Sequence, residues 1–245
     1  MIDLTTLLLR VSGKAGLRIG RVSNTLSYRR SHVLKDLRVN VVLDVGANQG
    51  QYSRELRRSG YSGRVVSFEP LSAPFLELQR YVAGSSNHKC SQMALGNSDG
   101  TASIYVSENT FSSSLLPIRG ESVKACPSSV CVGVETIQLR RLDSVRSDIL
   151  QPSDRVHLKL DTQGTEADVL LGARETLDQV VTIELEMSLA PLYENQLLMP
   201  QMFEMLRELG FRCVWIERAF TDPVSGHALQ VDGLILRREA DKNAS

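Results

Sequence analysis

The chain has 245 residues, enough for one α/β domain with a sizeable core, and its 42% apolar and 23% charged residues are ordinary for a globular protein. Lys plus Arg and Asp plus Glu both number 28, so the basic excess typical of nucleic-acid binders is absent, and we expect no nucleic-acid partner. No apolar run reaches the roughly 18 residues that span a bilayer, and no basic segment precedes the apolar start, so we expect a cytoplasmic protein without a signal peptide.

The N-terminal segment is basic. Between Arg10 and Arg38 there are eight Lys or Arg residues and one acid, Asp36. We expect residues 1–38 to form a helical lid with a solvated basic face. Basic amphipathic stretches also bind anionic membrane surfaces, and peripheral membrane contact through this segment is the alternative.

From residue 39 onward, apolar runs alternate with helical patterns. They predict one domain over residues 39–238, followed by a disordered tail over 239–245. Residues 101–142 have the composition of an inserted β-hairpin. Strands are expected at 39–45, 64–68, 91–95, 156–160, 180–185, 212–216 and 232–237. Helices are expected at 50–59, from an N-cap at Ser72 to 82, from a capping box at 165–168, and at 202–209. This order is typical of a parallel-rich sheet with helices on both faces, which binds ligands at the carboxyl ends of its strands.

A glycine turn follows the first strand, in the sequence Leu43-Asp44-Val45-Gly46-Ala47-Asn48-Gln49-Gly50. Gly46 allows a sharp bend and a close approach of the backbone to a ligand. Asn48 stands where a dinucleotide fingerprint has its second glycine, so the turn is not a pyrophosphate loop. Backbone amides at the start of a helix favour a carboxylate, and we expect this turn to bind one.

Acidic residues end three further strands. Glu69 lies 25 residues after Asp44, close to the spacing at which an acid accepts hydrogen bonds from ribose hydroxyls. Asp161 ends the strand at 156–160 and is expected in the same crevice; a helix N-terminal charge or a partner of a buried Arg are the alternatives. Glu184 and Glu186 share one face of the strand at 180–185 and beyond, and we expect one to be a base and the other an ion-pair partner.

These motifs resemble the FkbM family of S-adenosylmethionine-dependent methyltransferases over roughly residues 35–238. The resemblance is carried by the turn and Gln51-Tyr52, Gly60-Tyr61, Ser67-Phe68-Glu69-Pro70, Ala94-Leu95-Gly96, residues 109–115, Leu142-Asp143, residues 158–166, Leu192-Tyr193 and Gln230-Val231-Asp232. Many members carry Val-Glu where this chain has Thr162-Gln163. The resemblance implies a class I (Rossmann-like) methyltransferase fold with a seven-stranded, mostly parallel sheet. It also implies methylation of hydroxyl groups, often on sugars of glycolipids or polysaccharides and sometimes on polyketides.

The expected site divides into three groups. For S-adenosylmethionine we expect Asp44, Gly46, Ala47, Asn48, Gly50, Gln51, Tyr52, Glu69, Pro70, Ala94, Leu95 and Asp161. For the acceptor, a small molecule or a glycolipid, we expect Asn109, Ser113, Ser114, Gln163 and Tyr193. A base must take the proton of the attacking hydroxyl. Asp161 is the first candidate for that base, Glu184 or Glu186 the second, and His157 the third.

Other functions compete with this interpretation. A nicotinamide-dependent sugar oxidoreductase shares the fold but commonly has a Tyr-x-x-x-Lys pair and a glycine at position 48, which this chain lacks. A non-catalytic nucleotide-binding module and an amine methyltransferase are further alternatives. The four cysteines fit no zinc spacing and we assign no metal ligand, although Asp161 and a neighbouring acid form a plausible pair for a divalent ion.

Overall fold

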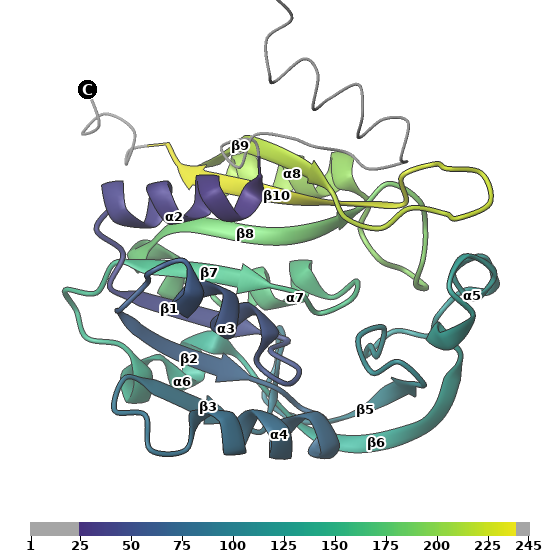
Figure 1. The fold of residues 1–245 in the computed structure, drawn as a ribbon, viewed down its shortest axis with the longest axis horizontal. Coiled ribbons are helices and arrows are strands. Elements are labelled where there is room, and N and C mark those ends of the chain that lie inside the picture. The colour runs from purple at the N-terminus through teal and green to yellow at the C-terminus, as the bar shows by residue number, and fades with distance from the viewer. Residues whose placement is uncertain (1–24, 239–245) are drawn as a thin grey trace, which may run out of the picture.

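A computed structural model describes residues 25–238. The expected tail at 239–245 and residues 1–24 of the expected lid lie outside the described residues. Seven strands of the described chain form one sheet in the order β3-β2-β1-β7-β8-β10-β9 (Figure 1). β10 runs antiparallel to β8 and β9, and the other pairs are parallel. The strands are β1 (Val41–Val45), β2 (Arg64–Phe68), β3 (His88–Ser91), β7 (Val156–Leu160), β8 (Val180–Ser188), β9 (Phe211–Arg218) and β10 (Gln230–Arg237).

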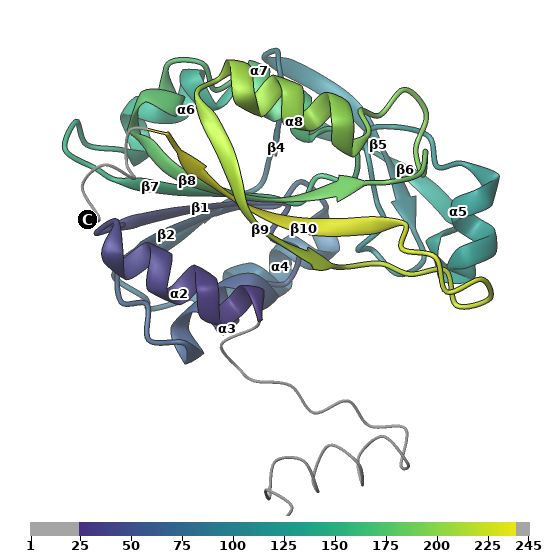
Figure 2. The ribbon, with the colours of Figure 1, turned by 90° about the horizontal axis from the view of Figure 1, so that it is seen from above.

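Helices cover both faces of this sheet (Figure 2). One face carries α2 (Leu26–Asp36), α3 (Gln51–Arg58) and α4 (Ser72–Val82). The other carries α6 (Leu142–Ile149), α7 (Glu166–Leu171) and α8 (Met199–Glu208). A short 3-10 helix, η3 (Thr176–Gln179), precedes β8. The predicted seven-stranded, mostly parallel sheet with helices on both faces is confirmed.

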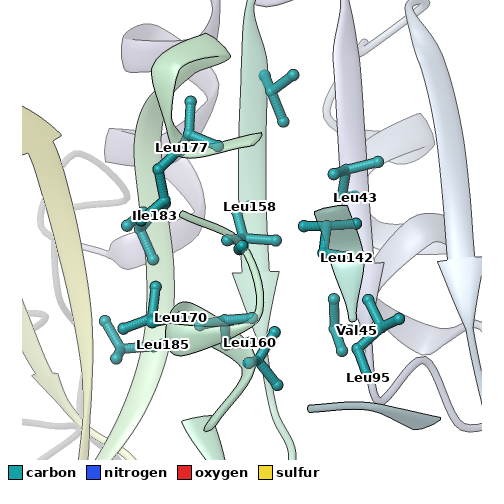
Figure 3. Packing of buried hydrophobic residues seen from close by; sticks show 14 of the residues in the cluster. Leu43, Val45, Leu95, Leu142, Leu158, Leu160, Leu170, Leu177, Ile183 and Leu185 are labelled. Atoms are coloured by element: carbon teal, nitrogen blue, oxygen red, sulfur yellow. The ribbon is translucent and has the colours of Figure 1, made fainter. Parts of the chain in front are cut away.

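The main core lies between the sheet and the face that carries α6 and α7. β1 and β7 are buried at all five of their positions, which is why their sequences are almost continuously apolar. Leu43 and Leu158 of these strands pack with Leu142 of α6 and Leu170 of α7 (Figure 3). Each fully buried Leu contributes roughly 1.5–3 kcal/mol. Burial therefore fixes the two central strands, and with them the start of the loops at their carboxyl ends.

A second, smaller sheet has the order β4-β6-β5. β5 (Gly100–Ser107) and β6 (Cys131–Arg140) pair antiparallel, as predicted for the hairpin at 101–142, and β4 (Ala94–Leu95) pairs with the end of β6. The segment between β5 and β6 contains α5 (Gly120–Ala125) and the 3-10 turn η2 (Pro127–Ser129). The single strand predicted at 91–95 is wrong, because a turn at Met93 separates β3 from β4 and places them in different sheets.

Two predicted helix starts also differ. Ser72 is the first residue of α4 and Leu71 is its N-cap, while the Ser72 hydroxyl donates to Glu135 on β6. Thr165 is the N-cap of α7, but its side chain donates to the Thr162 carbonyl at 3.2 Å and makes no capping bond. The two hydroxyl groups that the sequence pattern assigned to capping therefore bond elsewhere. Ser72 bonds the insertion, and Thr165 bonds the loop before α7.

The described part of the expected lid is α2, which packs against the sheet. Its Leu26 and Leu34 are buried, and the helix contacts β9 and β10. Arg30 is only 2% exposed, so the expectation of a fully solvated basic face is wrong at this residue. The reason is an acidic partner on β8, Glu184, which lies below the helix. No helix within residues 25–238 has the length and apolar character needed to cross a bilayer.

Candidate active site

A cavity of about 280 Å³ is lined by residues at the carboxyl ends of β1, β2 and β7 and by residues of the insertion that carries β5 and β6. β1 and β7 are neighbours in the sheet. The strands that follow β1 in the chain lie on one side of this pair, and those that follow β7 lie on the other. Parallel sheets bind ligands at such a switch point in strand order. The cavity is lined by Asp44, Val45, Gly46, Ala47, Asn48, Gln51, Tyr52, Phe68, Glu69, Pro70, Leu71, Met93, Ala94, Leu95, Ile104, Thr110, Phe111, Ser113, Ser114, Leu115, Lys159, Asp161, Thr162, Gln163, Thr165 and Glu186.

The turn after β1 follows the expected path but does not present free amides. Gly46 has φ +79°, a conformation that glycine adopts without strain, and a Cβ there would lie 1.9 Å from the carbonyl oxygen of Asp161. The amides of residues 46–50 donate to the Phe68 carbonyl, the Glu69 carboxylate, the Asn48 side chain and the Ala47 carbonyl. These amides thus form hydrogen bonds within the turn, to β2 and to Glu69, and binding of a carboxylate by the turn stays a prediction.

Glu69 is fixed at the end of β2. Its Oε2 accepts from the amide of Asn48 at 2.8 Å, and its Oε1 accepts from the amide of Leu71 at 2.9 Å. Burial raises the pKa of Glu69 to about 7, although these two hydrogen bonds act in the opposite direction. Each carboxylate oxygen keeps a second lone pair, so Glu69 can still accept hydrogen bonds from a ligand with neighbouring hydroxyls.

Asp44 and Lys159 form the floor of the cavity. Asp44 is 1% exposed, its Oδ2 accepts from the Ser67 hydroxyl at 3.1 Å, and burial raises its pKa to about 7 against the opposing effect of Lys159. Lys159 donates to the Leu160 carbonyl at 3.3 Å and lies 3.5 Å from Asp161 Oδ2. Burial lowers the pKa of Lys159, but surrounding acids outweigh burial and raise it, so the side chain stays protonated.

The side-chain amide of Gln163 bridges two acids, Asp161 at the end of β7 and Glu186 on β8. Gln163 Nε2 donates to Asp161 Oδ1 at 2.8 Å and to Glu186 Oε2 at 2.9 Å, while Gln163 Oε1 accepts from the Tyr193 hydroxyl at 2.8 Å. Glu186 Oε2 also accepts from Gln230 at 2.5 Å. Burial and the nearby Asp161 raise the pKa of Glu186 well above its usual value. Gln163 thus holds the carboxyl groups of Asp161 and Glu186 next to each other through one amide.

The loop after β7 is shaped by Glu166. Its carboxylate accepts from the amides of Thr162 at 2.9 Å and Gly164 at 3.0 Å, which closes the loop on itself. Gln163 has φ +54°, a strained value for a residue with a side chain. The loop thereby turns the Gln163 amide back between the two acids.

The insertion supplies the outer wall. Ser114 Oγ donates to the Gln163 carbonyl at 2.6 Å, and Ser113 Oγ accepts from the Ser107 amide at 3.0 Å. Phe111 lines the cavity and is 60% exposed, so its ring is open to solvent on this side of the site.

Some residues expected in the site lie outside the cavity lining. Gly50 has φ +86° and closes the turn beneath Leu78 and Tyr81. Asn109 orders the insertion by accepting from the amide of Ser112 at 2.9 Å, and Tyr193 is 3% exposed and holds Gln163. These three residues shape the walls rather than face the cavity.

Two of the proposed bases are also displaced. Glu184 is 3% exposed and its Oε1 binds Arg30 at 2.9 Å, so it is the ion-pair partner that the strand pattern allowed for. His157 is fully buried, and burial holds its pKa well below the usual value. Neither lines the cavity. We therefore assign no proton transfer to either residue.

Sequence reasoning missed several lining residues. Lys159 shares a strand face with Asp161 by the period of two, and that alternation could have indicated it. Phe68 is the last residue of β2, directly before Glu69, and Met93 lies between β3 and β4. No sequence pattern indicated Phe111, because its place in the cavity lining depends on how the insertion folds over the sheet.

The cavity suits S-adenosylmethionine. Glu69 is placed to accept from ribose hydroxyls, an apolar wall of Phe68, Met93 and Leu95 is placed to hold the adenine, and Asp44 can accept from the α-ammonium group. The lining carries four acids and, within the described chain, Lys159 as the lone cation, which favours a ligand with positive charge. The sheet order and this cavity define a class I S-adenosylmethionine-dependent methyltransferase.

Residues 44–213 match the model of the methyltransferase FkbM domain, and the chain belongs to this family. The 2-O-methyltransferase NoeI of Sinorhizobium fredii (strain NBRC 101917 / NGR234) is 24% identical over 174 residues, which cover 68% of this chain and 70% of NoeI. The family assignment favours a methyltransferase over the nicotinamide-dependent oxidoreductase considered from the sequence.

Solved methyltransferase structures resemble the chain loosely. Magnesium protoporphyrin IX methyltransferase (ChlM) from Synechocystis PCC 6803 is 10% identical, with a TM-score of 0.47 over 97% of this chain and 85% of that one. The Burkholderia thailandensis 1,6-didemethyltoxoflavin-N1-methyltransferase is 13% identical, with a TM-score of 0.45 over 95% and 88%. At these values the overlaps indicate neither substrate nor chemistry.

Proposed function

We propose that the protein methylates a hydroxyl group of a sugar, in a glycolipid or a polysaccharide. The observation that carries this proposal is the amide bridge of Gln163 between Asp161 and Glu186 at the end of the cofactor cavity. It holds two carboxyl groups next to each other, and the aromatic ring of Phe111 lines the same cavity. Sugar hydroxyls are weak nucleophiles, and a site for them needs a positioned base.

Bound S-adenosylmethionine supplies an activated methyl group with a good leaving group, so the chain mainly has to align the acceptor and remove its proton. Asp161 is the base in this scheme, because its side chain lines the cavity and is 41% exposed, while Glu186 is only partly exposed and its pKa is raised well above the usual value by burial and by Asp161. The new bond forms between the acceptor oxygen and the methyl carbon as the carbon–sulfur bond breaks, and the hydroxyl proton passes to Asp161. Alignment of this kind supplies roughly 7–11 kcal/mol.

The acceptor wall supports a sugar. A pyranose has an apolar face of C–H groups and a polar edge of hydroxyls. Phe111 offers an exposed ring for the face, while Ser113, Gln163 and Glu186 offer polar atoms for the edge. The likeness to NoeI, which is named a 2-O-methyltransferase, is in line with a hydroxyl acceptor.

The test is a transfer assay with S-adenosylmethionine that carries a deuterated methyl group. Acceptors are a panel of methyl glycosides and glycolipids, each with an amino-sugar counterpart in which the same hydroxyl is replaced by an amine. We expect an alkali-stable methyl ether on one or more glycosides, mapped by mass spectrometry, and its loss with Asp161→Asn. Transfer confined to the amines, or to a carboxyl group as an alkali-labile ester, contradicts the proposal.

A Phe111→Ala variant tests the sugar separately from the chemistry. Loss of the ring should raise KM for a glycoside several-fold, because stacking of this kind is worth about 0.5–1.5 kcal/mol, and should leave S-adenosylmethionine binding unchanged. The matched control is Val132→Ala, which removes an exposed apolar side chain on β6, 62% exposed and outside the cavity lining. Equal KM values for Phe111→Ala and the wild type remove the ring from acceptor recognition.

A further inference from the structure

Arg30 is a buried cation on the N-terminal helix α2, far from the acids of the cavity in sequence. Its side chain is 3% exposed, with Nη1 donating to Glu184 Oε1 at 2.9 Å and Nη2 donating to Glu55 Oε1 at 2.6 Å. Its guanidinium carbon lies 4.6 Å from the centre of the Tyr52 ring. Burial of a charge is costly unless it is paired, and Arg30 therefore depends on these partners as much as they depend on it.

Glu184 connects Arg30 to Tyr52, because each of its carboxylate oxygens bonds one of these two residues. While Oε1 of Glu184 binds Arg30, Oε2 accepts from the Tyr52 hydroxyl at 3.1 Å. The same hydroxyl lies 2.8 Å from His157 Nε2. A tyrosine hydroxyl has one hydrogen, and the carboxylate is the stronger acceptor, so we assign that hydrogen to Glu184 and the Nε2–H tautomer to His157. The hydroxyl of Tyr52 is then held from two strands, β8 and β7.

Tyr52 is the member of this hydrogen-bonded group that lines the cavity. It lines the cavity in the first turn of α3, directly after the glycine turn. Lys159 Nζ, which lines the cavity, lies 5.8 Å from the centre of the same ring. Three groups outside the cavity, from α2, β7 and β8, thus fix the orientation of one aromatic wall of the site.

We propose that Arg30 is a positioning residue of the cofactor site, which acts through Glu184 on Tyr52 and makes α2 a part of the binding machinery. Without Arg30, the Glu184 carboxylate loses its cationic partner in a buried position and turns or takes up a proton. Either change removes the firm acceptor of the Tyr52 hydroxyl, and the ring gains freedom at the wall of the cavity. The effect therefore falls on cofactor affinity, and it is independent of which acceptor is methylated.

The test is calorimetry of the full chain with S-adenosylmethionine and S-adenosylhomocysteine, with no acceptor present. For Arg30→Met we expect affinity for both ligands to fall about 10-fold, the size typical of a change transmitted through a contact network. Arg30→Lys, which keeps the charge but has one nitrogen for two partners, should recover part of this loss. Tyr52→Phe, which keeps the ring and removes the hydroxyl, should give a loss of similar size to Arg30→Met.

The matched control is Leu34→Ala in the same helix. Leu34 is 3% exposed and packs into an apolar cluster with Val42 and Leu56, and no hydrogen bond or ion pair of the network includes it. We expect it to lower the thermal unfolding midpoint without changing cofactor affinity. If Arg30→Met lowers the midpoint as Leu34→Ala does and binds both ligands like the wild type, Arg30 is a structural anchor and the proposal is wrong. Should Arg30→Met not fold, Tyr52→Phe and Glu184→Gln decide the question by the same affinity measurement.

Discussion

A Cβ atom at Gly46 would lie 1.9 Å from the carbonyl oxygen of Asp161, so the ends of the two central strands meet at the point where the cavity opens. The Asp161 amide also donates to the Val45 carbonyl at 3.0 Å. The turn that faces the cofactor and the strand end that carries the proposed base are thus one rigid unit. A change in the turn is therefore transmitted directly to the base.

Replacement of Gly46 by Ala should disrupt both the turn after β1 and the end of β7 at Asp161. We expect Gly46→Ala to lower the free energy of unfolding by roughly 2–5 kcal/mol, from the positive φ and the clash with Asp161, and to abolish measurable cofactor binding. Gly60→Ala is the matched control, since Gly60 has φ +92° and no atom within 4 Å of the added Cβ. It should cost about 1–2 kcal/mol in urea unfolding and leave calorimetric affinity unchanged. Similar behaviour of the two variants would contradict the close contact.

Removal of the proposed base should separate chemistry from binding. Asp161→Asn keeps the size of the side chain and should reduce kcat about 10²–10⁴-fold while the cofactor still binds. Glu184→Asp is a useful comparison, because Glu184 lies outside the cavity lining and should affect cofactor affinity more than the chemical step. Single-turnover rates measure the chemical step in both. Turnover of Asp161→Asn at the wild-type rate would move the base elsewhere.

A third carboxyl group at position 163 should shift the pH dependence. Gln163→Glu places it within 2.9 Å of both acids, where Gln163 Nε2 now donates. Like charges in contact raise the pKa of each other, so the acid limb of the kcat profile should move up by roughly 1–2 pH units. Gln163→Asn, which is neutral and too short to reach both acids, should reduce kcat without moving that limb. A profile for Gln163→Glu that overlays the wild type would refute the coupling.

Protons should leave the site when cofactor binds. The pKa values of Asp44 and Glu69 are raised by burial to about 7, and a positively charged ligand favours their ionised forms. We therefore expect S-adenosylmethionine binding near pH 7 to release protons and to strengthen as pH rises from 6 to 8. Calorimetry in buffers of different ionisation enthalpy measures this release. S-adenosylhomocysteine carries the same α-ammonium group and ribose hydroxyls and should also release protons, and binding of both ligands without any release would contradict this prediction.

The same two acids should make the free protein less stable at higher pH. Their folded pKa values lie above the unfolded ones, so the folded state binds more protons between about pH 4 and 7. Their contribution to stability is therefore present at low pH and lost as pH rises through about 7. Urea unfolding at pH 5 and pH 8 should show a smaller difference for Asp44→Asn than for the wild type. An equal difference would mean that Asp44 does not titrate in this range.

Much of the fold follows from local sequence pattern. β2 and β7 have the bounds that their apolar runs predict, and Glu69 and Asp161 end the expected strands beside the cavity. These predictions succeeded because a strand buried on both faces must be continuously apolar, and because parallel strands bring their carboxyl ends to one edge. Backbone chemistry also fixed Gly46, since the bend requires a residue without a side chain.

The remaining features depend on contacts between residues distant in sequence. The pairing of β4 with the end of β6 split one predicted strand into two, and the fold of the insertion brought Phe111 to the cavity. The roles of Glu184 and Glu186 differ although they share a strand face, because Arg30 from α2 neutralises one and Gln163 contacts the other. The sequence by itself determined the strands, the glycine turn and the acids at the strand ends, since each follows from local periodicity and backbone geometry. Only the tertiary structure decided which acid faces the ligand, because burial and partner choice depend on what the rest of the chain packs against it.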